Sequence, residues 1–317
     1  MRKRYSREKQ ETRMGLLFLL PSLIVIVLIT FLPIGQTFYR SLFRWDIKFE
    51  SRQYFTGLTN YTAIFQGLVN PDEALSWTVS FWHSAWVTFL FTVVAVSIET
   101  VLGLLIALII NREFRGRGLV RTATLVPWAI PTVASAQMWR MMFSSQGGVI
   151  NDIAKKLGLI TDYVNFLGDS TTTAFWSMVT ADAWKTTPFM ALLLLAGLQT
   201  IPLQLYEAAR VDGASKWRQF FSITLPMLKP SLLVALIFRT LDTFKAFDIA
   251  QVLTGGGPAS GTELLSLFNY KLMIQQGQHG RGSAVAIMLF VFTMLIAVFF
   301  IKVLGADPYA SKGRELK

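Results

Sequence analysis

The sequence predicts an all-α integral membrane protein with six transmembrane helices. Hydrophobic residues make up 53% of the 317 residues and charged residues only 15%, a balance that a water-soluble domain could not cover with polar surface. Six apolar stretches reach the roughly 20 residues that a helix needs to cross a bilayer core about 30 Å thick. Basic residues gather at the ends of these stretches, so the net charge of +11 indicates membrane orientation rather than nucleic-acid binding.

The six predicted spans are separated by connecting segments that alternate between the two sides of the membrane. The spans cover residues 14–36, 84–110, 121–143, 172–198, 231–252 and 281–303. Pro127, Pro131 and Pro188 lie inside them, where neighbouring helices can satisfy the backbone groups that a proline leaves unpaired. Kinks are expected at these positions.

The distribution of Lys and Arg predicts which segments face the cytoplasm. These residues number six in 1–13, four in 111–121, four in 199–230 and four in 302–317, each time exceeding the acidic residues. The positive-inside rule therefore places both termini in the cytoplasm. The segments on the other side, 37–83, 144–171 and 253–280, carry no basic excess and are predicted to face outward.

The cytoplasmic segment 199–230 carries the most informative pattern. A short helix is expected to begin at Pro202, to break at Gly213 in a positive-φ conformation, and to give way to a second amphipathic helix that ends before Pro226. The result would be a rigid elbow. An ordinary charged connector, the alternative, would not combine these features.

The elbow resembles the signature of permease subunits of binding-protein-dependent ABC importers. Glu207-Ala208-Ala209 is followed after three residues by Gly213 and after nine more by Ile-x-Leu-Pro ending at Pro226. Further stretches are similar to the carbohydrate subfamily, in particular to the larger maltose permease subunit: LPS at 20–22, FLP at 31–33, GLTNY at 57–61 and LTGGGP at 253–258. This resemblance implies the type I, maltose-permease-like fold of ABC importers.

The resemblance also implies a domain organisation. A basic cytoplasmic tail (1–13), a first transmembrane helix (14–36) and an external loop (37–83) would precede a five-helix transport core (84–303), and a cytoplasmic tail (304–317) would follow. The core would contain the coupling loop 199–230, which docks on an ATPase in this family. The residues expected to make that coupling are Glu207, Ala208, Ala209, Asp212, Gly213 and Ala214.

The same resemblance implies partners. One subunit would form half of a pathway in the cytoplasmic membrane of a bacterium or archaeon, together with a related second permease, an ATPase homodimer and an external solute-binding (lipo)protein. ATP and Mg²⁺ would belong to the ATPase, because the only dense glycine run, 255–257, lacks the lysine of a phosphate-binding loop. This chain itself is expected to bind no cofactor.

Charged residues inside the spans are candidates for function, because charge at bilayer depth is costly and is expected to face the protein interior or a water-filled path. These residues are Glu99, Asp182, Lys185, Arg239, Asp242, Lys245 and Asp248. Spacing places Arg239, Asp242, Thr243 and Ala246 on one face of the fifth span. The alternative is that such charges form buried ion pairs that join helices or subunits.

Resemblance to the maltose permease subunit implies which of these positions contact a sugar. The substrate path would comprise Lys185, Thr186, Phe189, Arg239, Asp242, Thr243 and Ala246, with Phe189, Phe244 or Trp184 supplying faces for sugar rings. Ionic groups stand here where the maltose subunit has smaller or apolar ones, so a different sugar or a site shared with the partner is expected. Four stretches look most like trehalose importers: 101–104, 118–123, 184–190 and 238–242. Maltose, glucosylglycerol and glycerol-phosphate remain alternatives.

Other function classes receive less support. An ion-driven secondary transporter would have no ATPase-docking elbow, and it would usually show two related halves, which this sequence does not. No catalytic constellation is present for a membrane-embedded enzyme. Cysteine is absent and the two histidines, His83 and His279, are far apart in the sequence, so no metal site is expected.

Overall fold

The computed structural model describes residues 2–47, 50–69 and 76–303, and the predicted C-terminal tail 304–317 lies outside them. The chain divides into two compact units, Met1–Thr78 with Asn269–Met288 and Val79–Phe268 with Leu289–Lys317. Each unit is described by itself. Helices α4 (Ser76–Asn111), α13 (Leu265–Tyr270) and α14 (His279–Val303) contribute residues to both.

The first unit joins a long helical segment, which is apolar from Met14 to Ser41, to a small hairpin. Its further elements are α1 (Arg2–Ile26), a π-helical turn (Val27–Phe31), α2 (Leu32–Ser41), β1 (Phe43–Asp46), β2 (Glu50–Phe55), α3 (Thr59–Val69) and a second π-helical turn (Lys271–Gln275). Strands β1 and β2 pair antiparallel, with Phe43 opposite Phe55. The hairpin and α3 were not expected from the sequence, and both lie in the segment 37–83 that was predicted only as a loop.

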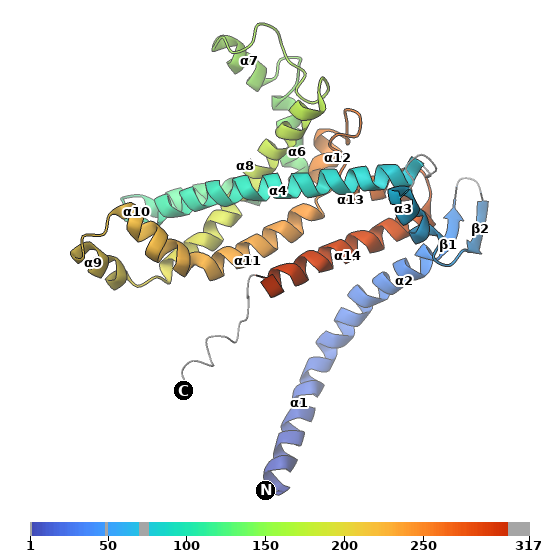
Figure 1. Cartoon of the computed structure of the whole chain (residues 1–317), viewed down its shortest axis with the longest axis horizontal. Helices are drawn as coiled ribbons and strands as arrows, with labels where there is room; N and C mark the ends of the chain where they lie inside the picture. The colour runs from blue at the N-terminus through green and yellow to red at the C-terminus, as the bar shows by residue number, and fades with distance from the viewer. Residues whose placement is uncertain (1, 48–49, 70–75, 304–317) are drawn as a thin grey trace. The chain divides into compact units, whose positions relative to one another are not determined.

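The second unit is a helical bundle with a bent connection at one end (Figure 1). Its further elements are α5 (Arg117–Ala129), α6 (Thr132–Met142), α7 (Val149–Lys156), α8 (Thr171–Gln199), α9 (Leu203–Val211), α10 (Lys216–Gln219), a π-helical turn (Phe220–Thr224), α11 (Leu225–Phe244) and α12 (Asp248–Leu253). Helix α8 packs against α5, α11 and α12. It is therefore the central helix of this unit.

Small residues allow the helices of the second unit to approach closely. A Cβ added to Gly103 of α4 would lie 2.7 Å from Cγ of Met190 on α8. Gly197, near the end of α8, similarly faces Ser231 and Leu228 of α11. Such contacts are typical of helix packing in membranes. Next to them lies an apolar core to which α4, α8 and α11 contribute Ile110, Leu194 and Leu228.

Four helical segments are long and apolar enough to cross a membrane: Met14–Ser41, Ser80–Asn111, Lys216–Phe244 and His279–Lys302. A fifth span is obtained if α8 and α9, which meet at a 68° bend, are counted together. These segments correspond to five of the six predicted spans. The third predicted span, 121–143, is covered by α5 and α6, which are separate helices.

Two spans that were predicted to be continuous are broken. The 121–143 prediction was wrong at Ile130, which is extended (ψ 133°), because the proline that follows it disfavours helical geometry there. The 231–252 prediction was wrong after Phe244, where α11 ends before α12 begins at Asp248. Ser266 stabilises this second break by donating its hydroxyl to the carbonyl of Ala246.

The elbow also differs from its prediction at one point. Gly213 adopts φ +76°, as expected. The second helix, however, does not end before Pro226 but continues through the π-helical turn into α11, so that Lys216–Phe244 forms one long helix. A proline has no N–H to donate to the carbonyl four residues back. The wide turn tolerates this because its hydrogen bonds reach five residues back, as the bond from the N–H of Leu225 to the carbonyl of Phe220 does.

Candidate functional site

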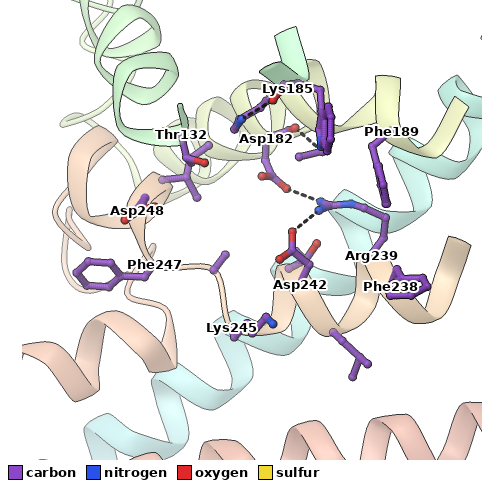
Figure 2. Close-up of a pocket in the computed structure, with 16 residues that line it drawn as sticks. Thr132, Asp182, Lys185, Phe189, Phe238, Arg239, Asp242, Lys245, Phe247 and Asp248 are labelled. Carbon is purple, nitrogen blue, oxygen red and sulfur yellow. Dashed lines mark hydrogen bonds and ion pairs between the residues drawn. The ribbon is translucent and has the colours of Figure 1, made fainter. Parts of the chain in front are cut away.

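A polar cavity of about 720 Å³ lies between α5, α6, α8, α11 and α12, at the two helix breaks (Figure 2). It is lined by Trp128, Thr132, Asp182, Lys185, Thr186, Phe189, Phe238, Arg239, Leu241, Asp242, Thr243, Lys245, Ala246, Phe247, Asp248 and Ile249. All seven residues predicted for the substrate path are among them. The breaks thus place backbone and charged side chains around one space.

Arg239 is the centre of an ion cluster at the wall of this cavity. Its Nε donates to Oε2 of Glu99 at 2.7 Å and its Nη2 to Oε1 of Glu99 at 2.9 Å. A third bond runs from Nη2 to Oδ2 of Asp182 at 3.3 Å, and a fourth from Nη1 to Oδ2 of Asp242 at 2.9 Å. The cluster therefore joins α4, α8 and α11.

The cluster is buried at one side and open at the other. Arg239 is 3% exposed and Glu99 is fully buried, whereas the side chain of Asp242 is 67% exposed. Thr186 donates to Oε1 of Glu99 at 2.8 Å, which adds a partner inside the cluster. Since a charge is stable at such depth only when it is paired, Glu99 and Arg239 hold helices together, and Asp242 is the group that the cavity can reach.

Lys185 is bound to the break between α5 and α6. Its Nζ donates to the carbonyl of Ile130 at 2.7 Å and to that of Trp128 at 3.4 Å. The last carbonyls of a helix have no partner within the helix and favour a cation. Lys185 thus stabilises the broken end of α5 and attaches it to α8.

Aromatic side chains also line the cavity, and the sequence analysis predicted only some of them. Trp128 and Phe189 stack with ring centroids 5.6 Å apart and an interplanar angle of 15°. Phe238 lines the same cavity and is 59% exposed. Of the other aromatic candidates, Trp184 and Phe244 do not line it.

Several lining residues were missed by the sequence analysis as parts of the path. Trp128 and Thr132 belong to the helix break that was predicted as a continuous span, and Phe247 follows the second break. Lys245 and Asp248 had been identified as intramembrane charges but not assigned to the path. The kink expected at Pro131 indicated the position of the first break, but not that the helix would end there.

The predicted coupling residues lie at the opposite end of α8 and α11 from α12 (Figure 1). Glu207, Ala208, Asp212 and Gly213 are exposed, while Ala209 and Ala214 are half-buried. Tyr206 Oη lies 2.9 Å from Oγ1 of Thr224, and this bond fixes α9 to the π-helical turn. The outer surface of the elbow therefore combines charged groups with exposed apolar side chains, among them Val211 and Trp217.

Relatives named as transport permeases match nearly the whole chain. The trehalose/maltose transport system permease protein MalF of Thermococcus litoralis is 46% identical over 93% of this chain and 94% of its own length. The trehalose transport system permease protein SugA of Mycobacterium tuberculosis is 38% identical over 93% and 90%. The sulfoquinovosyl glycerol transport system permease protein SmoG of Agrobacterium fabrum is 37% identical over 92% and 90%.

The fold is shared with a solved transporter. A chain of a bacterial ABC transporter that imports the acidic polysaccharide alginate superposes with a TM-score of 0.77 over 96% of this chain and 99% of that one, at 22% identity. The family described as binding-protein-dependent transport system inner membrane component matches residues 99–305, about two thirds of the chain. The chain therefore belongs to this family of ABC importer membrane permeases.

Proposed function

We propose that this chain is the permease subunit of an ATP-driven sugar importer and that the cavity beside Asp242 is its half of the translocation path. The proposal rests on the observation that all seven residues predicted for the path line one cavity. The names of the relatives support sugar transport, and two of them name trehalose. A disaccharide such as trehalose is therefore the proposed substrate.

The chemistry of the cavity suits a neutral, hydroxyl-rich molecule. Asp242, Lys245 and Asp248 are exposed charged groups that can exchange hydrogen bonds with hydroxyls. Thr243 has a buried hydroxyl without a partner among the described residues. Trp128, Phe189 and Phe238 supply apolar ring surface, and the volume of about 720 Å³ lies in the range of small-ligand sites.

The contacts divide the proposed path residues into two roles. Arg239 and Lys185 already donate to protein acceptors and so act as positioning residues that shape the cavity. Asp242 accepts a hydrogen bond from Arg239 but remains exposed to the cavity, and it is the proposed direct sugar ligand. The proposal thus assigns ion pairing to some of the intramembrane charges and sugar contact to others.

The assembly follows from the proposed function. A related second permease would complete the path, an external solute-binding (lipo)protein would deliver the sugar, and an ATPase homodimer holding ATP and Mg²⁺ would dock on the elbow through Glu207, Ala208, Ala209, Asp212, Gly213 and Ala214. Both termini would be cytoplasmic in a bacterial or archaeal membrane.

Transport by the reconstituted complex tests this function. Asp242→Asn removes the charge of the exposed carboxylate but keeps its shape, and uptake of labelled trehalose into proteoliposomes should fall at least about tenfold because hydrogen bonds to charged groups are strong. Asp162→Asn, at an exposed position that does not line the cavity, is the matched control. Unchanged uptake in Asp242→Asn would contradict the proposal. Competition by unlabelled maltose, glucosylglycerol and glycerol-phosphate ranks the alternative substrates.

A further inference from the structure

A second cavity, of about 470 Å³, lies within the first unit and takes no part in the proposed path. It is formed by the hairpin, the start of α3, and the starts of α4 and α14. Its lining residues are Arg44, Trp45, Asp46, Thr56, Thr59, Asn60, Ala63, Trp77, Gln278 and Arg281. Arginine, tryptophan and small polar side chains thus surround one space.

Two guanidinium groups line this cavity. Arg281 lies over the ring of Trp77, with Cζ 5.3 Å from the ring centroid, and donates from Nη1 to Oε1 of Gln278 at 3.1 Å. Arg44 is exposed, and no hydrogen bond or ion pair holds its guanidinium among the described residues. Asp46 is the only carboxylate among the described lining residues, so these residues together carry a surplus of one positive charge.

Hydrogen-bond donors are also in surplus. Trp77 is 7% exposed, and its indole Nε1 is buried without an acceptor among the described residues. An N–H group in that position costs free energy unless a bound molecule or solvent accepts its hydrogen bond. This N–H is itself enclosed, so the guanidinium donors of Arg44 and Arg281 decide which ligand the cavity favours, namely one with acceptor oxygens and negative charge.

The backbone around the cavity is held in place before any ligand binds. Asn60 donates from Nδ2 to the carbonyls of Ser41 at 2.8 Å and Phe43 at 3.2 Å. Ile47 donates its backbone N–H to Gly277 at 3.1 Å, which fixes the end of β1 near the start of α14. The arginines are therefore presented from an ordered frame, which lowers the entropy cost of binding.

We propose that this cavity is a carboxylate-binding site. A planar guanidinium matches a carboxylate through two parallel N–H···O bonds, and Arg44 has its donors available for this geometry. The volume lies in the range of small-ligand sites, and Trp45 and Trp77 offer ring surface to the remainder of the ligand. The carboxylate belongs either to a small organic acid or to an acidic side chain of a protein, and the site does not depend on the proposed sugar path.

Binding of glucuronate and glucose to the full chain in lipid nanodiscs tests the site, because these two sugars differ by one carboxylate. Calorimetric titration at low salt should show saturable binding of glucuronate only. Arg44→Gln should weaken it at least about tenfold, as should Arg281→Gln. Arg40→Gln removes the same charge from an exposed position that stacks on Trp45 without lining the cavity, and it should change the affinity less than about twofold.

Two results would overturn the proposal: equal binding of glucose and glucuronate, or unchanged glucuronate affinity in both Arg44→Gln and Arg281→Gln. Gel filtration of each variant shows whether it is folded, and Arg44, being exposed, provides the variant least affected by packing. A parallel titration with N-acetylglutamate α-amide, which imitates a glutamate side chain in a protein, distinguishes a small organic acid from a protein side chain as the source of the carboxylate. Tighter binding of this compound than of glucuronate would indicate a protein side chain, and tighter binding of glucuronate a small acid.

Discussion

Glu99 on α4 and Arg239 on α11 are joined by two side-by-side hydrogen bonds, of 2.7 and 2.9 Å, in a place that solvent does not reach. Removing one member of a buried pair costs up to about 3–5 kcal/mol, and without the charge of Glu99 the guanidinium of Arg239 would keep only its single bonds to Asp182 and Asp242. We therefore expect Glu99→Gln to lower the melting temperature of the detergent-purified chain by several degrees. Asp242→Asn, at the exposed end of the cluster, should cost less than about 1 kcal/mol. Equal melting temperatures for the two variants would contradict this division.

Lys185 should stabilise the backbone conformation at the break between α5 and α6. In Lys185→Met the aliphatic part of the side chain remains, but the carbonyls of Trp128 and Ile130 lose their charged donor. We expect faster amide hydrogen exchange at 132–136 at the start of α6. Lys229→Met, on an exposed face of α11, is the control and should leave this exchange unchanged. The prediction fails if both variants exchange alike.

Gly213 should be required for coupling because of its backbone conformation. Its φ is +76°, and an added Cβ would meet no atom within 4 Å, so Gly213→Val carries only the conformational cost of about 1 kcal/mol or more. The change in the elbow angle should release the ATPase or abolish its stimulation in inside-out vesicles. Gly158→Val is a matched control, since Gly158 has φ +69° and equally open surroundings. Normal stimulation in Gly213→Val would show that the loop is only a connector.

Ala209 should be required for a different reason. It is half-buried on α9 and small enough for that helix to lie close to another surface, so Ala209→Trp adds bulk where docking is proposed. Membrane insertion and pairing with the second permease should be retained, while ATPase co-purification is lost. Gln204→Trp, at an exposed position five residues earlier on α9, tests whether any added ring has this effect.

Membrane orientation can be measured directly because the chain contains no native cysteine. Single cysteines at the exposed positions Gln66 and Asp162 should react with an impermeant maleimide added to intact cells, whereas cysteines at Arg115 and Lys216 should react only after permeabilisation. A reversed pattern at any one position would contradict the proposed topology.

Composition and charge were sufficient to predict where most of the helices lie. Helix α8, predicted at 172–198, covers Thr171–Gln199, and α14, predicted at 281–303, covers His279–Val303. The breaks were not predictable from hydropathy, because Ile130 is as apolar as its neighbours. A three-residue gap after Phe244 also leaves the average polarity of the segment unchanged. Such breaks depend on tertiary partners, among them Lys185 and Ser266.

The sequence predicted charged residues that line the cavity, but not which of them pair with other protein groups. Charge at bilayer depth identified Arg239, Asp242 and Lys185, and all three line the cavity. That Arg239 is held by Glu99, from a helix 140 positions away in the sequence, required the folded structure. The same applies to the stacking of Trp128 on Phe189, since these residues lie on different helices.

The π-helical turn at Phe220–Thr224 sets the angular phase between the elbow and the cavity. It holds one residue more than an α-helical turn, and each residue of an α-helix advances the chain by about 100°. If the same residues were wound as a regular α-helix instead, Arg239 and Asp242 would be rotated by about that angle relative to α9. The wide turn thus absorbs one surplus residue, and the direction in which Arg239 and Asp242 face depends on this turn staying π-helical.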